Sequence, residues 1–158
     1  MKNIRMDKVY ITNTPNTEKG LFTYQEILKK DESTRNNSIQ IDKNTYLKDV
    51  DETIRFINHS CDPNGWIKIT KNGVFLVALR DITEGEELTF DYSITMDEDN
   101  WEMNCNCQSI KCRKRIQDFK YLSETIQQEY IKKRIVPKYV LSGLKSKLRL
   151  VIETKVKN

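Results

Sequence analysis

The chain has one histidine and four cysteines, and these side chains are the first candidates for chemistry. The histidine, His59, lies in the stretch RFINHSCDPN, two positions before Cys61. A histidine can act as a general base or as a metal ligand, because its unperturbed pKa lies near neutrality. Which of these roles is open to it depends on the cysteines.

Three of the cysteines form the cluster CNCQSIKC, and the fourth lies far upstream. Zinc in a structural site takes four ligands in a tetrahedron, and four thiolates are a common set. Three cysteines so close together favour such a site over ordinary buried or reactive thiols, which remain the alternative. A shell of four cysteines is complete without His59, so a ligand role for the histidine becomes a minor alternative. The predicted ligands are Cys61, Cys105, Cys107 and Cys112.

The composition is that of a globular domain inside the cell. The chain has 158 residues, of which 37% are hydrophobic and 32% charged, enough for one domain with a real core. No apolar run approaches the roughly 20 residues of a membrane span, and the start MKNIRMDKVY lacks the apolar block of a signal peptide. We therefore expect an intracellular protein, in the cytoplasm or the nucleus or nucleoid, that is neither secreted nor bound to a membrane. Its cysteines should be reduced.

The net charge of +4 conceals an uneven distribution. Residues 1–112 contain 14 Lys and Arg against 19 Asp and Glu, whereas residues 113–158 contain 13 against 4. The acidic body should attract a cationic partner, and the basic tail could contact an anion such as nucleic acid. The alternative for the tail is an ordinary solvated surface.

Hydrophobic periodicity predicts many short strands followed by a helix. The first two strands are separated by a turn at Pro15, and a helix begins at a Ser123 N-cap and ends before Pro137. In ELTFDYS, Leu88, Phe90 and Tyr92 should share one face of a strand. The expected strands are Val9 to Thr14, Gly20 to Ile27, Ser38 to Asp42, Val74 to Ile82 and Glu87 to Ser93, and residues 138–158 are left unassigned.

Together these pieces resemble the SET-domain protein lysine methyltransferases. The matching segments are EKGLF, RFINHSCDPN, GEELTFDY and CNCQSIKC, which occur in the order typical of that family. The cysteine cluster resembles the post-SET zinc site. The resemblance implies a mainly β (α+β) fold of small sheets with a C-terminal pseudoknot, followed here by a C-terminal helix. It suggests a SET domain over residues 1–104, a post-SET zinc segment over 105–120 and a basic helical extension over 121–158.

The resemblance also implies an enzyme that uses S-adenosylmethionine. The residues that should border this cofactor are Lys19, Gly20, Leu21, Phe22, Arg55, Phe56, Asn58, His59 and Tyr92. His59 would then shape the cofactor pocket, and a histidine that is merely hydrogen-bonded in a turn is the alternative.

Three features depart from the family pattern. Glu18 replaces the first glycine of the usual G-x-G, and Gln108 stands where a glycine is usual after the second zinc cysteine. The Glu-Tyr-x-Gly-Glu segment, which normally supplies an aromatic cofactor contact, is missing. Trp101 could close over cofactor or substrate, and a plain core role is the alternative.

Methyl transfer requires a neutral lysine amine in line with the methyl group. An apolar channel and the sulfonium charge both lower the pKa of the amine, so no strong protein base is required. Tyr92 and Phe90 are the predicted catalytic residues: the Tyr92 hydroxyl would orient the reacting groups, and backbone carbonyls would hold the methyl group by C–H···O contacts. Leu88 is assigned to the core. Phe90 in place of a tyrosine implies that di- or trimethyllysine can form.

The predicted substrate is a basic protein, such as a histone or histone-like tail that contains the target lysine. Two acidic clusters should line its groove: Asp49, Asp51 and Glu52, and Asp97, Glu98, Asp99 and Glu102. The alternative function is a non-catalytic, zinc-stabilised binding module whose basic tail contacts nucleic acid.

Overall fold

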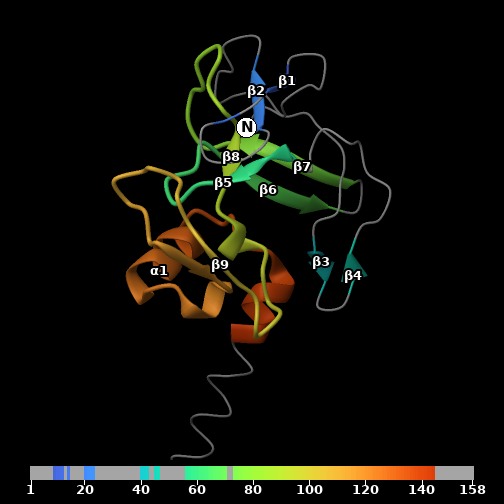
Figure 1. The fold of residues 1–158 in the computed structure, drawn as a ribbon. Helices are drawn as coiled ribbons and strands as arrows, with labels where there is room; N and C mark the ends of the chain where they lie inside the picture. The colour runs from blue at the N-terminus through green and yellow to red at the C-terminus, as the bar shows by residue number, and fades with distance from the viewer. Residues whose placement is uncertain are drawn as a thin grey trace, which may run out of the picture.

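The computed structural model describes residues 9–12, 14, 20–23, 40–42, 45–46, 56–70 and 73–144. Within these ranges the chain runs through short strands before a helical C-terminal part (Figure 1). The strands are β1 (Val9–Thr12), β2 (Gly20–Thr23), β3 (Gln40–Asp42), β4 (Thr45–Tyr46), β5 (Asn58–His59), β6 (Gly65–Thr70), β7 (Gly73–Ala78), β8 (Thr89–Phe90), β9 (Glu102–Asn104) and β10 (Arg115–Gln117). The labelled helical elements are the 3-10 turns η3 (Tyr92–Ile94) and η4 (Phe119–Tyr121) and the α-helix α1 (Glu124–Lys132), and residues 138–144 are also helical.

The strands pair two by two. In the described part of the chain, β1 with β2, β3 with β4, β6 with β7 and β9 with β10 are antiparallel, whereas β5 and β8 are parallel. Parallel neighbours need a long crossover. Here the crossover contains the whole β6–β7 hairpin, so the fold brings together two segments that are distant in sequence.

Strand β7 separates two hydrophobic clusters. Val74, Leu76 and Ala78 face a cluster that also contains Leu88 and Phe90. The alternate side chains of β7 face a second cluster that includes Trp66, Phe119, Tyr130 and Val140. Because side chains of a strand point alternately to opposite faces, a strand buried on both sides must be apolar throughout. This explains the continuous run VFLVAL.

A glycine allows β6, β7 and β8 to approach one another. A Cβ atom at Gly65 would lie 2.9 Å from Cδ1 of Leu76 and 3.3 Å from the carbonyl oxygen of Thr89. The latter contact is with backbone, which cannot move aside without shifting β8. The absence of a side chain at Gly65 therefore lets the hairpin pack against the strand that precedes Tyr92.

The predicted helix is confirmed. The Ser123 hydroxyl accepts a hydrogen bond from the backbone N–H of Ile126, and the helix ends before Pro137. The strand predicted over ELTFDYS is wrong in its second half. Strand β8 ends at Phe90, and Tyr92 begins η3, because the Asp91 side chain accepts a hydrogen bond from the N–H of Ser93 and caps the turn.

Strand β6 was not predicted from the sequence. Its residues, GWIKIT, mix polar and apolar types, but the following Asn72-Gly73 pair is a strong hairpin signal. The strand expected over Val74 to Ile82 is present as β7 and ends earlier, at Ala78. The strands expected at Ser38 and near the N-terminus are present where the structure describes them, and residues 13, 24–27, 38 and 39 of those predictions lie outside the described ranges.

The described C-terminal part shares a core with the strands. Residues 138–144, which were left unassigned, are helical, and Val140 packs in the same cluster as Trp66 and Phe119. None of the helices among the described residues combines the length and the apolar character needed to cross a membrane.

Candidate functional site

The parallel pair β5–β8 brings the segments RFINHSC and GEELTFDY together. Asn58 lies opposite Thr89, and His59 lies opposite Phe90. The pairing continues through a 3.2 Å hydrogen bond from the N–H of Ser60 to the carbonyl oxygen of Phe90. The predicted cofactor residues Asn58 and His59 therefore lie next to the predicted catalytic residues.

Tyr92 is held by the segment it faces. Its hydroxyl donates a 2.8 Å hydrogen bond to the carbonyl oxygen of Ile57, and its backbone N–H donates to Nδ1 of His59 over 3.2 Å. Burial, and then the negative charge of Glu87, raise the pKa of Tyr92 to about 12. The phenol therefore stays protonated at physiological pH and acts as a hydrogen-bond donor.

The ring of Tyr92 lies among aromatic side chains. The centroid of its ring is 4.8 Å from that of Phe90 and 5.3 Å from that of His59. Trp101 lies farther away, with its ring centroid 6.4 Å from that of Tyr92. Trp101 is half-buried and packs beside the cysteine cluster. Phe90, His59 and Trp101 thus surround the Tyr92 ring, and of these aromatic residues Tyr92 and His59 line the cavity described below.

Both ring nitrogens of His59 have partners. Because Nδ1 accepts the N–H of Tyr92, the proton of the neutral ring resides on Nε2, which lies 3.3 Å from Sγ of Cys61. Burial lowers the pKa of His59 to about 4, in the same direction as the nearby Arg113, and outweighs the opposing effect of Asp91. A neutral, doubly engaged imidazole can shape a pocket wall but is poorly suited to act as a base near neutral pH.

A cavity of about 220 Å³ opens beside these residues. It lies between the parallel pair and the segment that carries Cys105 and Cys107. Asn58 and Glu87 face each other at this site, joined by a 2.6 Å hydrogen bond. The lining residues are Thr14, Asn58, His59, Ser60, Glu87, Thr89, Tyr92, Met103, Asn104, Cys105, Asn106 and Cys107.

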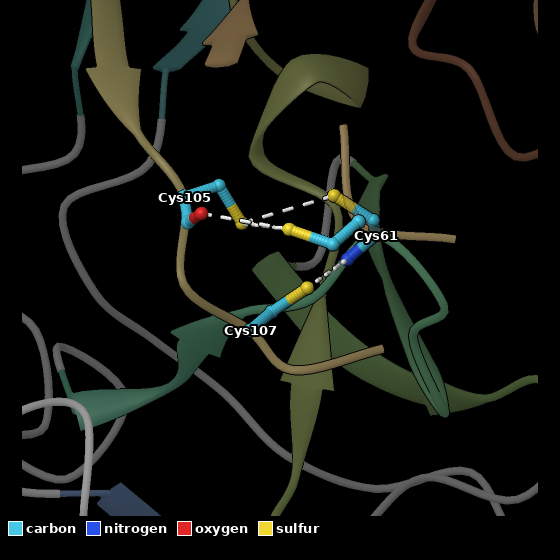
Figure 2. A group of neighbouring side chains, drawn as sticks. Cys61, Cys105 and Cys107 are labelled. Carbon is cyan, nitrogen blue, oxygen red and sulfur yellow. Dashed lines mark hydrogen bonds between the residues drawn. The ribbon is translucent and has the colours of Figure 1, made fainter. Parts of the chain in front are cut away.

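The four cysteines come together from two distant segments. Figure 2 shows Cys61 from one segment beside Cys105 and Cys107 from the other. Their Sγ atoms all lie within 4.8 Å of one another. Sγ of Cys105 is 3.8 Å from that of Cys61 and 3.7 Å from that of Cys112. A tetrahedron with Zn–S bonds of about 2.3 Å would place its sulfur atoms about 3.8 Å apart. The donor set and its spacing therefore fit one zinc ion.

Backbone groups favour the thiolate form at one of these positions. Burial raises the pKa of Cys107, but the N–H groups of Cys61 and Ser109 point at its sulfur atom and outweigh that effect. The pKa of Cys107 is lowered to about 7. A thiolate is the form that binds metal, so this sulfur atom is prepared for ligation at physiological pH.

A buried ion pair connects the cysteine segment to the turn that carries Tyr92. The guanidinium of Arg113 donates two 2.7 Å hydrogen bonds to the carboxylate of Asp91. The backbone N–H of Arg113 also donates to Sγ of Cys61 over 3.3 Å. The predicted metal site and the predicted catalytic turn are therefore joined by one residue.

Some residues predicted to contact the cofactor do not border the cavity, and others lie outside the described residues. Leu21 is buried in the hydrophobic core, and Gly20 begins β2. Phe56 is half-buried. Lys19 and Arg55 lie outside the described residues, as does the side chain of Phe22. Their contacts stay predictions.

Sequence reasoning missed part of the cavity wall. Glu87 and Thr89 belong to GEELTFDY, and Met103, Asn104 and Asn106 adjoin the cysteines. Proximity to these motifs was the available signal. Thr14 offers no such signal, because its position depends on the tertiary fold.

Part of the second acidic cluster is paired within the molecule. Asp99 pairs with Lys120, and Glu102 pairs with Arg115. The cluster at Asp49, Asp51 and Glu52 lies outside the described residues. The second cluster is therefore partly neutralised by the C-terminal segment.

Comparison with known families gives a direct match. The SET domain family model matches residues 3–93, more than half of the chain. This chain belongs to the SET-domain family. Over 101 residues it is 41% identical to the variant-silencing SET domain-containing protein of Plasmodium falciparum. This alignment covers 60% of this chain and 4% of that protein. Over 81 residues it is 40% identical to the H3 lysine-4 specific histone-lysine N-methyltransferase of Saccharomyces cerevisiae. This alignment covers 47% of this chain and 8% of the yeast protein.

Solved structures support the fold. The methyltransferase domain of human histone-lysine N-methyltransferase SETMAR aligns with a TM-score of 0.52 at 20% identity, covering 70% of this SET chain and 58% of that chain. KRYPTONITE in complex with mCHH DNA, an H3(1–15) peptide and SAH aligns with a TM-score of 0.51 at 23% identity. The alignment covers 69% of this chain and 29% of the KRYPTONITE chain. The predicted SET fold of small sheets is confirmed. The chain spans less than a tenth of the length of the two curated relatives.

Proposed function

We propose that this SET protein is an intracellular, S-adenosylmethionine-dependent protein lysine N-methyltransferase. The observation that carries the proposal is the β5–β8 pairing, which holds the Tyr92 hydroxyl, the neutral His59 and Asn58 around one cavity. Two of the relatives supply further support: the yeast protein is named a histone-lysine N-methyltransferase, and KRYPTONITE was solved with SAH.

The residues of the site fit the demands of the reaction. S-adenosylmethionine, when bound, supplies an electrophilic methyl group. The attacking lysine must be a neutral amine, and the apolar surroundings of Phe90 and Tyr92 disfavour its protonated form. Tyr92 keeps its hydroxyl fixed on the Ile57 carbonyl and so orients the reacting groups. Asn58 and His59 form the wall of the cofactor pocket.

We further propose that the four cysteines bind one structural zinc ion. The metal would tie Cys61, which follows the cofactor wall, to the segment containing Cys105, Cys107 and Cys112. That segment lines the cavity, so the ion would hold one wall of the site in place. The spacing of the sulfur atoms supports this ligand set.

For the substrate we propose a basic segment that contains the target lysine, such as a histone tail. The acidic balance of residues 1–112 supports a cationic partner. KRYPTONITE was crystallised with a histone H3 peptide. Phe90 carries no hydroxyl that could hold the amine, so we propose that the product extends to di- or trimethyllysine.

Incubation with radiolabelled S-adenosylmethionine and a panel of basic proteins tests the activity. Wild type should label lysine, and it should bind S-adenosylhomocysteine in calorimetry. A Tyr92→Phe variant, which keeps the ring but loses the hydroxyl, is the matched control. Absence of labelling together with absence of cofactor binding would refute the proposal.

The rival function, a binding module with a nucleic-acid contact, receives less support. Part of the basic C-terminal charge is used within the molecule, since Arg113 pairs with Asp91 and Lys120 with Asp99 and Asp118. Salt-dependent retention on DNA by a wild-type protein that methylates nothing would favour the rival.

A further inference from the structure

Asp91 is a fully buried carboxylate that lies between the two predicted catalytic residues. It has no exposed surface. A buried charge is costly unless it is paired and hydrogen-bonded, so its partners determine whether this turn is stable. Three different segments donate hydrogen bonds to it, namely the turn itself, the cysteine segment and helix α1, and Nδ1 of the neutral His59 lies 3.6 Å from Oδ1.

The contact from helix α1 comes from Tyr130. Its hydroxyl donates a 3.0 Å hydrogen bond to Oδ2 of Asp91, across 39 positions of sequence. Only 6% of Tyr130 is exposed, and its ring packs in the cluster with Trp66 and Phe119. Burial, together with the negative charge of Asp91, raises the pKa of Tyr130, so its hydroxyl remains a donor. Hydrogen bonds to an ionised acceptor are among the stronger ones in proteins.

The other two contacts complete the set around the carboxylate. Arg113 binds both oxygens, each over 2.7 Å, and also reaches the hydroxyl of Ser93 over 3.2 Å. The N–H of Ser93 donates to Oδ1 over 3.1 Å. Tyr130 and the first guanidinium nitrogen share Oδ2, while the second nitrogen and Ser93 share Oδ1. Losing Tyr130 would thus leave Oδ2 with one partner.

The position of Asp91 determines the position of Tyr92. Asp91 is the N-cap of η3, and Tyr92 is its first residue. The turn directs the Tyr92 hydroxyl towards Ile57 and the Tyr92 N–H towards His59. A shift of the Asp91 carboxylate would rotate this turn and move the hydroxyl from its place at the cavity.

We propose that Tyr130 is a positioning residue of the active site, through which helix α1 fixes the Asp91 cap and hence the Tyr92 hydroxyl. Tyr130 lies outside residues 3–93, the part that matches the SET domain family model. The catalytic centre of this chain therefore depends on a helix beyond the matched domain. This inference rests on the proposed methyltransferase function.

The variant Tyr130→Phe tests the proposal, because it keeps the buried ring and removes only the hydroxyl. We expect kcat to fall about tenfold, which corresponds to about 1.4 kcal/mol, while KM for the peptide and Kd for S-adenosylhomocysteine change less than twofold. Arg113→Lys, which keeps the charge but loses the two-pronged contact with Asp91, should shift kcat in the same direction. Unchanged kcat in Tyr130→Phe would overturn the proposal.

A matched control separates positioning from simple loss of packing. Val140 is 2% exposed, lies in the same cluster as Tyr130 and has no polar side-chain atom that could bind Asp91. Val140→Ala should lower Tm at least as much as Tyr130→Phe and leave kcat, measured well below Tm, at the wild-type value. If the two variants lose activity in proportion to their loss of Tm, Tyr130 is only a core residue.

Hydrogen exchange provides a readout that does not require activity. Amides in the peptide spanning residues 88–96 should exchange about tenfold faster in Tyr130→Phe than in wild type, and should be unchanged in Val140→Ala. Equal exchange in wild type and Tyr130→Phe contradicts the inference, whether or not the protein methylates. If these amides exchange faster in Tyr130→Phe but the wild-type protein methylates nothing, the proposed function fails while the connection from helix α1 holds.

Discussion

The hydroxyl of Tyr92 lies 2.8 Å from the carbonyl oxygen of Ile57, to which it donates a hydrogen bond. This contact joins the two segments that pair as β5 and β8, directly at the cavity. Since 35 positions separate the two residues, the contact depends on the whole crossover and on the β6–β7 hairpin within it. A phenol held in this way is oriented before any ligand arrives.

Tyr92→Phe should abolish most of the activity. The variant keeps the aromatic packing against Phe90 but removes the oriented hydroxyl, and the loss of one positioned polar group at a reaction centre costs about a hundredfold in kcat. Steady-state kinetics and calorimetry with S-adenosylhomocysteine check this expectation. Cofactor affinity should change little. A variant with more than a tenth of wild-type kcat would show that Tyr92 does not orient the reaction.

Asn64→Ala should lower the free energy of unfolding more than substitution of an exposed asparagine does. Asn64 is 2% exposed; its amide donates to the carbonyl oxygen of Glu87 over 2.7 Å and its side-chain oxygen accepts from the N–H of Thr89 over 2.9 Å. Removing it takes these partners from the carbonyl of Glu87 and the N–H of Thr89, both partly buried, at a cost of about 2 kcal/mol. Urea denaturation measures the change. Asn100→Ala, at an exposed asparagine, should alter the stability by less than about 0.5 kcal/mol.

The sequence predicted features set by local rules and missed those set by distant contacts. Helix α1 was predicted because its Ser123 cap and apolar stripe are readable within one window. The turn at Tyr92 was read as a strand, since the alternation of Leu88, Phe90 and Tyr92 fits a strand. Its cap is the Asp91 side chain, whose buried charge depends on Arg113 and Tyr130 far along the chain.

The residues of the candidate site also fall into two groups, those that the sequence could identify and those that only the tertiary fold places at the cavity. The cysteines could be selected from residue type and spacing alone, whereas the roles of Asn58 and His59 came from the resemblance to the SET-domain family. Leu21 belongs to the matching EKGLF segment, yet its side chain is buried in the core. Thr14 lines the cavity without any distinctive neighbour in sequence. Residue type predicts which chemistry is available, but packing decides which side chain borders the cavity.

Cys112→Ser should reduce the zinc content and the activity together. A serine hydroxyl does not replace the fourth thiolate, so the segment lining the cavity loses its attachment to Cys61. Elemental analysis of wild type should give one zinc per chain, and a chelator should lower Tm. Lys111→Ala changes the adjacent exposed residue without removing a sulfur atom, and it should keep zinc and activity. Freshly purified wild type without zinc would contradict the metal assignment.

Neutralising Asp97 and Glu98 should weaken the binding of basic peptides. These carboxylates belong to the acidic cluster that the sequence predicts to line the peptide groove. For the double variant Asp97→Asn, Glu98→Gln we expect KM to rise severalfold at low salt, with a smaller change in kcat and a weaker dependence on salt. Glu84→Gln, at an exposed turn, is the control for net charge. An unchanged KM refutes the assignment of a peptide groove to this cluster.

The last prediction concerns the number of methyl groups added. Phe90 is 7% exposed, and its ring centroid lies 4.8 Å from that of Tyr92. A tyrosine hydroxyl at this position could hold the amine and crowd out a second methyl group, whereas phenylalanine leaves a methylated amine free to rotate and present its lone pair again. Phe90→Tyr should therefore shift the product towards monomethyllysine while turnover continues.

Mass spectrometry of a peptide driven to completion distinguishes the products. Wild type should accumulate di- or trimethyllysine, and Phe90→Tyr should stop mainly at one methyl group. Phe75→Tyr adds a hydroxyl on the opposite side of β7, in the cluster away from Phe90, and should leave the product distribution unchanged. A wild-type protein that stops at monomethyllysine would mean that another group supplies the hydrogen bond, and that Phe90 does not set the product.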